Sequence, residues 1–457
     1  MTPEVTPQYS SELNDSHLPW WQGVPRYAWI VFIIAALGWL FDAMDQNLFS
    51  LLRQPSLTDI LSHTGISGDV LDKAVKQVGG NITAIFLLGW AAGGLFFGVV
   101  GDKLGRSKTM VVTILIYASF TGLTGLAQNS FQYSVCRFLT ALGVGGEFAA
   151  GASLVAEVWP ERSRPMALGM LQALSAVGNM TAGLITWVLA GLSWRWGYLV
   201  GAAPALVVVW IRASVKEPEM WKEARDNALA DSSKKVGSIA ALFEDPILRR
   251  NTIAGALIAT AGVGGLWGVG FFLPDLTGTV MKQAVVHLPK PQASTQLQTW
   301  RSQVFMVQQL GAFFGMFSYA ALSVRTGRKP ALYLFLALAW ASIVATFWGV
   351  TSLPTAFGFA FLLGFCALAP FSAFAVYFPE LYPTRLRATG VGFCYNCARI
   401  LAASAPFMLG HLAAAFHSNS DPVHGFRVAA SIVSCVYVLG FVGLFMAPET
   451  HGKPLPE

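Results

Sequence analysis

Long apolar runs, separated by short polar stretches, recur along nearly the whole chain of 457 residues. An α-helix rises about 1.5 Å per residue, so about 20 apolar residues cross the roughly 30 Å hydrocarbon core of a bilayer. We therefore predict an all-α membrane protein with twelve transmembrane helices. The predicted spans are Tyr27–Leu51, Asn81–Val100, Lys108–Gln128, Phe131–Glu157, Pro165–Ala190, Trp196–Ala213, Thr252–Val280, Gln303–Val324, Ala331–Val350, Pro354–Tyr377, Thr389–Phe416 and Phe426–Met446.

The composition supports this prediction. Hydrophobic residues make up 54% of the chain and charged residues only 12%, and the mean hydropathy is +0.54. Soluble domains carry about twice that share of charge. The first apolar run is too long, and starts too far from the N-terminus, for the short apolar core of a cleaved signal peptide, so we expect a permanent span.

The formal net charge of +6 raises the question of nucleic-acid binding. Basic residues, however, cluster in short loops such as "DKLGRSK", "PERSR" and "RTGRK", which all fall on one predicted side. Lysine and arginine concentrate on the cytoplasmic side of membrane proteins. We therefore expect cytoplasmic N- and C-termini and no nucleic-acid partner.

The five cysteines fall inside apolar spans, so no disulfide framework is expected. Cys394 and Cys397 form a single CxxC without a second pair, which favours core packing over a metal site. We expect neither a metal nor a cofactor.

A charged interval between the sixth and seventh spans divides the chain into two halves. Gly105 and Arg106 recur as Gly327 and Arg328 at an offset of 222 residues, and "EVWPERSR" from Glu157 recurs as "ELYPTRLR" at an offset of 223. Two matches at nearly one offset indicate a duplicated six-helix unit, which can rock about a central site. The predicted segments are an N-terminal tail 1–26, a first bundle 27–213, a linker 214–250 with one or two surface helices, a second bundle 251–447 and a tail 448–457.

Four motifs in these positions resemble those of the major facilitator superfamily. They are "GVVGDKLGRSK" after the second span, "RFLTALGVGGE" in the fourth, "PELYPTRLRATGVGFCYN" before and in the eleventh, and the C-terminal "PETHGKPLPE". The resemblance covers essentially the full length of the chain. The four motifs together are similar to those of the metabolite:proton symporter branches, including sialate, lactate and aromatic-acid carriers. It implies two pseudo-symmetric six-helix bundles and secondary active transport by alternating access.

One position departs from the motif. Val324 stands in the second half where Asp102 stands in the first. We therefore expect the second half to lack its loop-to-helix ion pair.

Ionisable side chains at membrane depth need a partner or water. Asp42 and Asp45 share one helix face, roughly 9 to 14 Å below the outer end of the first span, and Arg137 lies at about 9 Å in the fourth. We expect one aspartate to exchange a proton while Arg137 either holds the other or competes with the proton for the same carboxylate. The alternative is a permanent structural pair.

Arg399 lies about 17 Å into the eleventh span, near the membrane midplane. Its guanidinium can bind a carboxylate with two hydrogen bonds, and Asn396 and Tyr395 precede it on the same helix. We assign these three residues to substrate binding. The alternative is a charge neutralised by another helix, and Asp275 is the nearest candidate partner in the second half.

Amides within the spans also bear on the cavity. Each can line a substrate cavity or join helices by hydrogen bonds, and the second role is the commoner one in bundles. The candidates are Gln172, Asn179, Gln308 and Gln309. For Glu147, beside "GVGG", we favour a role in helix packing or gating over a proton site.

Charged residues of the loops on the terminus side are assigned to gating. Ion pairs among them would latch the cytoplasmic gate and break as the halves rock, and the alternative is solvated topogenic charge. They are Asp102, Arg106, Glu157 and Arg162, with Glu380 and Arg385 at the repeated positions.

These observations together predict a proton-coupled importer of a small organic anion, such as a monocarboxylate, aromatic acid or sugar acid, in a bacterial inner membrane. We expect a monomer in the lipid bilayer. Within transport the alternatives are a neutral-sugar carrier and a drug exporter, and outside it a membrane nutrient sensor. An enzyme is not expected, because no nucleophile-base-acid set or phosphate loop occurs in the sequence.

Overall fold

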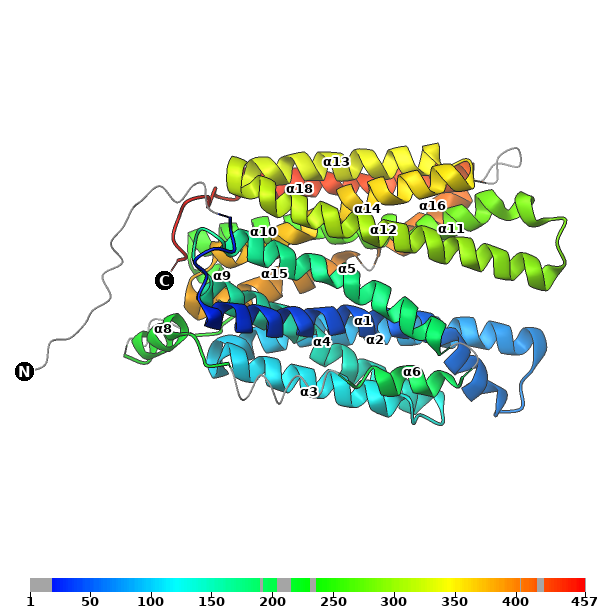
Figure 1. Ribbon diagram of the computed structural model, residues 1–457, viewed down its shortest axis with the longest axis horizontal. Helices are drawn as coiled ribbons and strands as arrows, with labels where there is room; N and C mark the ends of the chain where they lie inside the picture. Colours follow the sequence, from blue (N-terminus) through cyan, green and yellow to red (C-terminus); the bar gives the residue numbers. More distant parts are fainter. Residues whose placement is uncertain are drawn as a thin grey trace, which may run out of the picture.

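The described part of the chain is built from helices (Figure 1). The computed structural model describes residues 19–189, 192–203, 215–230, 236–402, 404–416 and 423–456. Within these ranges nine helices are long and apolar enough to cross a membrane, and no strand occurs. The all-α prediction is therefore confirmed, whereas the number of twelve spans stays a prediction.

The first half begins with a helix longer than expected. The predicted first span ends at Leu51, but α1 continues through Pro55 to Ser62. Part of the predicted sixth span, residues 204–213, lies outside the described residues. The helices of this half are α1 (Arg26–Ser62), α2 (Gly68–Leu104), α3 (Arg106–Thr124), α4 (Ser130–Val158), α5 (Arg164–Val188) and α6 (Trp194–Val200).

Two short helices precede the second half, α8 (Glu219–Ala230) and α9 (Ala241–Glu244). The predicted seventh span is interrupted by a 3₁₀ turn, η2 (Gly270–Phe272), between α10 and α11. The helices of this half are α10 (Pro246–Gly268), α11 (Leu273–Val280), α12 (Lys290–Thr326), α13 (Arg328–Gly349), α14 (Leu353–Val376), α15 (Arg387–Ala402), α16 (Ala405–Ala415), α17 (His424–Val433) and α18 (Tyr437–Met446), with the 3₁₀ turns η3 (Met281–Val285), η4 (Phe378–Leu381), η5 (Thr384–Leu386) and η6 (Ser434–Val436).

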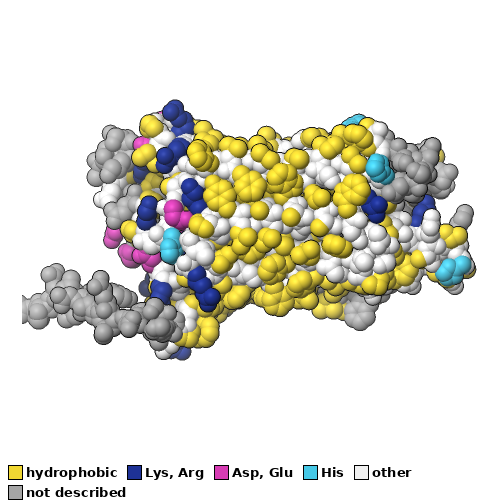
Figure 2. Space-filling model, turned by 90° about the horizontal axis from the view of Figure 1, so that it is seen from above, with side chains coloured by type: hydrophobic (Ala, Val, Ile, Leu, Met, Phe, Trp, Pro, Cys, Tyr) yellow, Lys and Arg dark blue, Asp and Glu magenta, His cyan; other side chains and the backbone are white. Residues whose placement is uncertain are grey.

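The two halves lie side by side with their helices roughly parallel to one long axis (Figure 1). They meet along two helix pairs, α5 with α12 and α2 with α15. Both described chain ends lie at the same end of this bundle, which we call the terminal end; the opposite end is the far end. Figure 2 shows an apolar middle with lysine, arginine, aspartate and glutamate gathered toward the ends, as a membrane-spanning bundle requires.

The same turn precedes α3 and α13, which correspond to the third predicted span of each half. Gly105 before α3 and Gly327 before α13 have φ of 113° and 96°, a region that glycine enters at little cost. In each half, a glutamate just after the last predicted span of that half caps the helix that follows this glycine. Glu217 accepts hydrogen bonds from the backbone N–H groups of Ser107 and Lys108 at 3.2 and 3.0 Å.

Glu449 does the same for α13, accepting from the N–H groups of Arg328 and Lys329 at 3.0 and 2.9 Å. A carboxylate at a helix N-terminus satisfies free backbone donors and complements the helix dipole. The duplicated cap is a third sign of internal repetition, beside the two sequence matches.

Candidate functional site

A cavity of about 300 Å³ lies between the two halves. Five aromatic side chains, four uncharged polar side chains and two arginines make up most of its wall. It is lined by Gln46, Asn47, Phe49, Ser50 and Arg53 of α1, Thr83, Phe86, Leu87 and Trp90 of α2, Val263 and Trp267 of α10, Phe272 of η2, and Arg399 and Ala402 of α15.

A larger hollow of about 670 Å³ lies toward the far end, among α1, α5 and α6 of the first half. Its one carboxylate, Asp59, is already within 3.6 Å of the Arg195 guanidinium and accepts a 2.9 Å hydrogen bond from the Trp194 indole. Because it does not reach the second half, we place the functional site in the smaller cavity.

Arg399 is held in the cavity wall by aromatic rings. Its guanidinium carbon lies 3.9 Å from the ring centroids of both Trp90 and Tyr395, and one Nη donates a 2.6 Å hydrogen bond to the Asn396 side chain. Such cation–π contacts fix a guanidinium without neutralising it. Within the described residues no carboxylate lies within ion-pair distance of Arg399; Asp275 instead interacts electrostatically with Arg301.

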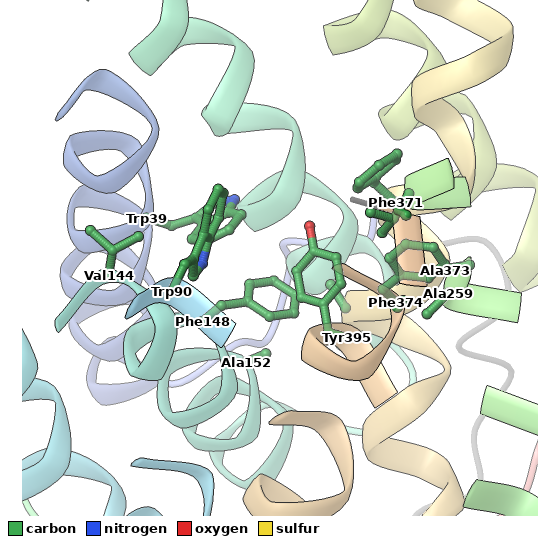
Figure 3. Close-up of a cluster of buried hydrophobic side chains, with 14 of the residues drawn as sticks. Trp39, Trp90, Val144, Phe148, Ala152, Ala259, Phe371, Ala373, Phe374 and Tyr395 are labelled. Carbon is green, nitrogen blue, oxygen red and sulfur yellow. The ribbon is translucent and has the colours of Figure 1, made fainter. Parts of the chain in front are cut away.

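Figure 3 shows the aromatic cluster to which Trp90 and Tyr395, the two rings against Arg399, belong. Trp90 of α2, Phe148 of α4 and Tyr395 of α15 lie together, with Phe371 and Phe374 of α14 beyond them. The rings of Phe148 and Tyr395 are 5.1 Å apart, and those of Tyr395 and Phe374 are 5.4 Å apart. The cluster joins both halves next to Arg399, which lines the cavity.

Asp42 and Glu147 form a second feature near the cavity. Both side chains are buried, and neither carboxylate has a hydrogen-bond partner. The Glu147 carboxylate of α4 lies against Gly38 of α1, where even a methyl group would collide with it. Gly38 is one turn before Asp42, and the two acids interact electrostatically, as do Asp42 and Arg399. Asp42 therefore interacts electrostatically with both an acid and the guanidinium of Arg399.

Asp45 has a different environment. Its carboxylate lies 3.4 Å from the Arg137 guanidinium and accepts a 2.6 Å hydrogen bond from Thr121. Arg137 also donates to the hydroxyls of Thr124 and Thr140 at 2.8 and 3.1 Å. Arg137 is therefore satisfied by Asp45 and threonines, whereas Asp42 is left without a direct partner.

Two of the four candidate amides join helices, which is the role that the sequence analysis favoured over cavity lining. Asn179 of α5 accepts from Asn47 of α1 at 2.6 Å and donates to Gln309 of α12 at 2.7 Å, so a chain of amides crosses from one half to the other. Of these three residues only Asn47 lines the cavity. Buried amides need partners, and in this bundle they find one another.

The remaining predicted binding residues also lie outside the cavity wall. Gln308 donates to the Gly270 carbonyl at 3.3 Å, and Gln172 is buried on α5. Asn396 and Tyr395 lie behind Arg399 and orient it rather than facing the cavity. Of the residues that we predicted to bind substrate, only Arg399 lines the cavity.

A buried ionic network closes the terminal end between the halves. Glu157 at the end of α4 pairs with Arg106 at 3.0 Å and with Arg387 of the second half at 2.8 Å. Asp102 accepts hydrogen bonds from the N–H groups of Ala388 and Thr389 at 3.2 and 2.8 Å, and so caps α15 from the other half. Three of the repeated segments, those with Arg106, Glu157 and Arg387, therefore meet here.

The second half keeps one of the two ion pairs that the first half makes. In the first half Arg106 pairs with Asp102 at 2.7 Å and with Glu157 at 3.0 Å. In the second half Val324 replaces the acid, and Arg328 lies 3.0 Å from Glu380, with its Nε donating to the same carboxylate at 3.1 Å. Thr450 of the C-terminal tail adds a hydrogen bond to Glu380 at 2.5 Å.

Glu449 of this tail lies outside the membrane-spanning segments. Partial burial acts to raise the pKa of its carboxyl, but four backbone N–H groups, those of Arg328, Lys329, Thr450 and His451, donate to it and hold the pKa below its ordinary value.

Two predicted gate residues, Arg162 and Arg385, take part in hydrogen bonds to or from backbone groups at the terminal end. Arg162 donates to the backbone carbonyl of Gln22 at 3.0 Å, which ties the start of the described chain to the end of α4. The carbonyl of Arg385 accepts a 3.0 Å hydrogen bond from Gly237 of the connecting segment.

The sequence analysis missed three features of the site. Glu147 was assigned to packing or gating, although its carboxylate faces the helix that carries Asp42. Arg53 lies beyond the end of the predicted first span and was counted with the loop charges. Arg387 was not singled out, although it provides the ion pair between the halves. Among the described residues no group of His, Cys, Asp and Glu could hold a metal.

Comparisons with known proteins bear on this arrangement. The family model described as Major Facilitator Superfamily matches residues 28–290. The cis,cis-muconate transport protein of Acinetobacter baylyi is 30% identical, with 85% of this chain and 89% of that protein covered. The sialic acid transporter NanX of Escherichia coli is 27% identical over 83% of this chain and 85% of that protein. The structure of the proton:xylose symporter XylE, at 16% identity, superposes with a TM-score of 0.70 over 94% of this chain and 98% of that one.

Proposed function

The chain belongs to the major facilitator superfamily of transporters, and on this premise we propose that it imports a small organic anion together with a proton. It is a multi-pass membrane protein and not an enzyme. The observation that carries the proposal is the buried guanidinium of Arg399, which lines the cavity between the halves without a carboxylate partner among the described residues.

A guanidinium in this position favours an anion over a neutral ligand. It is always charged, and a carboxylate can accept two parallel hydrogen bonds from it. The rings of Trp90 and Tyr395 hold its plane, so little side-chain entropy is lost on binding. The names of the muconate and sialic acid transporters describe organic acids as the cargo of those relatives, which supports the same class here.

The proton is assigned to the pair formed by Asp42 and Glu147. Two carboxylates in dry surroundings repel each other, so such a pair is suited to holding a proton. An ionised Asp42 also competes with the substrate for the positive charge of Arg399. Protonation of Asp42 removes that competition, so anion and proton bind together.

Release requires the network at the terminal end to open. Glu157, Arg106 and Arg387 close that end in this structure, while the cavity lies between the halves and away from it. Rocking of the halves about the cavity would break these pairs and open the cavity toward the terminal end. We propose that the terminal end faces the cytoplasm of a bacterium and that the protein works as a monomer in the inner membrane.

A ligand screen on the purified protein tests the assignment. Small carboxylic acids, their neutral amides and neutral sugars are compared for thermal stabilisation at two pH values, since a ligand that binds only the folded state raises the midpoint of unfolding. We expect acids to stabilise and the matched amides not to. Stabilisation by sugars alone would favour a neutral-sugar carrier, and a ligand that binds but is not taken up by proteoliposomes would favour a sensor.

A further inference from the structure

A second guanidinium, that of Arg53, lines the same cavity. Arg53 is half-buried on α1, and its Nη1 donates to the Thr83 hydroxyl of α2. Thr83 in turn donates to the Gly79 carbonyl at 2.7 Å, which fixes its oxygen as an acceptor. The guanidinium carbon lies 5.9 Å from the Phe49 ring. No carboxylate of the described residues lies within ion-pair distance of Arg53.

The two arginines contact α2 at two different residues, and the spacing of these residues indicates how far apart the arginines are anchored. Arg53 is anchored at Thr83, and Arg399 lies over Trp90. These anchors are seven residues apart on one helix, so they share a face and lie about 10 Å apart along the axis. Phe86 and Leu87 fill the interval between them in the cavity wall. On its α2 side the cavity thus has a cation near each end and apolar side chains in the interval.

Aromatic rings line the same cavity as the two cations. Phe49, Phe86 and Trp267 line it, and the Phe49 and Phe86 rings are stacked at 5.0 Å. Aromatic faces favour planar, conjugated ligands. Two unpaired cations in one partly desolvated space are costly unless a ligand supplies compensating negative charge.

We propose that Arg53 binds a second carboxylate, and that the preferred substrate is a dicarboxylate whose two acid groups are joined by a short, planar, unsaturated carbon chain. This inference rests on the proposed function, because it takes Arg399 as the first carboxylate site. It assigns to Arg53 the discrimination between dianions and monoanions of one skeleton.

Matched acids test the inference. Sorbate and trans,trans-muconate share one six-carbon diene skeleton and differ by one carboxylate, as benzoate and terephthalate do on a benzene ring. Binding of each is measured at pH 7 on the purified full-length protein and on its Arg53→Gln variant. We expect the wild type to prefer the diacid of at least one pair, and Arg53→Gln to weaken diacid binding by about tenfold or more while leaving the monoacid unchanged, because a charge-assisted contact is lost only for the diacid.

Lys282→Gln is the matched control. Lys282 is exposed in η3 toward the far end and does not line the cavity, so its removal changes the net charge equally without removing a binding group. If Arg53→Gln weakened binding of the diacid and the monoacid equally, or weakened neither, the inference would be overturned and the anion site at Arg399 would stand. Binding of no acid by the wild type would overturn both.

Discussion

Glu157 at the end of α4 and Arg387 at the start of α15 form an ion pair at 2.8 Å that joins the two halves, and both side chains are fully buried. Arg106 shares the same carboxylate oxygen at 3.0 Å. One carboxylate therefore holds two cations at the terminal end. Removing one partner of a buried pair costs about 3 to 5 kcal/mol because the remaining charge is uncompensated.

Glu157→Gln is expected to shift the population toward a state open at the terminal end. The amide cannot neutralise Arg106 and Arg387, so contact between the halves weakens there. Spin labels on Lys108→Cys and Arg325→Cys, both exposed at that end, report the separation of the halves. We expect longer distances in the variant; an unchanged distribution would show that the pair does not hold the gate. Glu161→Gln, at an exposed position nearby, serves as the control.

Arg399→Lys is expected to weaken binding of an acid substrate by about tenfold or more. A lysine keeps the charge but loses the planar fork and much of the stacking on Trp90 and Tyr395. Uptake of radiolabelled acid over a concentration range measures the apparent affinity. Unaltered uptake by this variant would remove Arg399 from the binding site.

Asp42→Asn and Asp45→Asn are expected to differ in kind. The first removes a carboxylate without a direct partner, so exchange of substrate across the membrane should persist while the dependence of net uptake on a proton gradient is lost. The second leaves Arg137 uncompensated and should lower the free energy of unfolding by about 3 kcal/mol. Counterflow assays and thermal unfolding separate the two. Identical phenotypes would contradict the different roles assigned to the two acids.

Sequence reasoning anticipated the repeat because the turn chemistry is local. Gly105 and Gly327 stand before a helix in both halves, and the arginine after each pairs with the glutamate that the repeat predicts, Glu157 or Glu380. The geometry of such motifs can be predicted from the local sequence, because a positive φ and a helix start depend on neighbouring residues.

The site was harder to predict because depth along a helix does not give the direction of a side chain. Counting residues placed Arg399 near the midplane but could not show its aromatic neighbours, and it gave no reason to pair Glu147 with Asp42. The Glu147 carboxylate reaches the helix that carries Asp42 because Gly38 leaves room for it. Arg53 was missed because α1 continues past Leu51, so a charge that appeared to lie beyond the membrane lies in the cavity wall.

Acid should weaken the cap that Glu449 provides for α13. The pKa of this carboxyl is below its ordinary value of 4.5, so its contribution to stability is present above that value and is lost as pH falls through the lowered pKa. At pH 7 we expect Glu449→Gln to lower the free energy of unfolding by about 1 kcal/mol. Thermal unfolding from pH 7 to pH 3 should show the difference from wild type shrinking below pH 4.5. A difference independent of pH would contradict the cap, and Glu223→Gln on α8, where the side chain is exposed, controls for net charge.

The most direct test is whether the anion brings a proton with it. Purified protein in weakly buffered solution at pH 7 is mixed with an acid ligand found in the screen, and the pH change is recorded for the wild type and for Asp42→Asn. Binding at Arg399 with protonation beside Asp42 predicts uptake of about one proton per ligand by the wild type, and none by the variant. Ligand binding by the wild type without proton uptake, or the same uptake in the variant, would contradict the account.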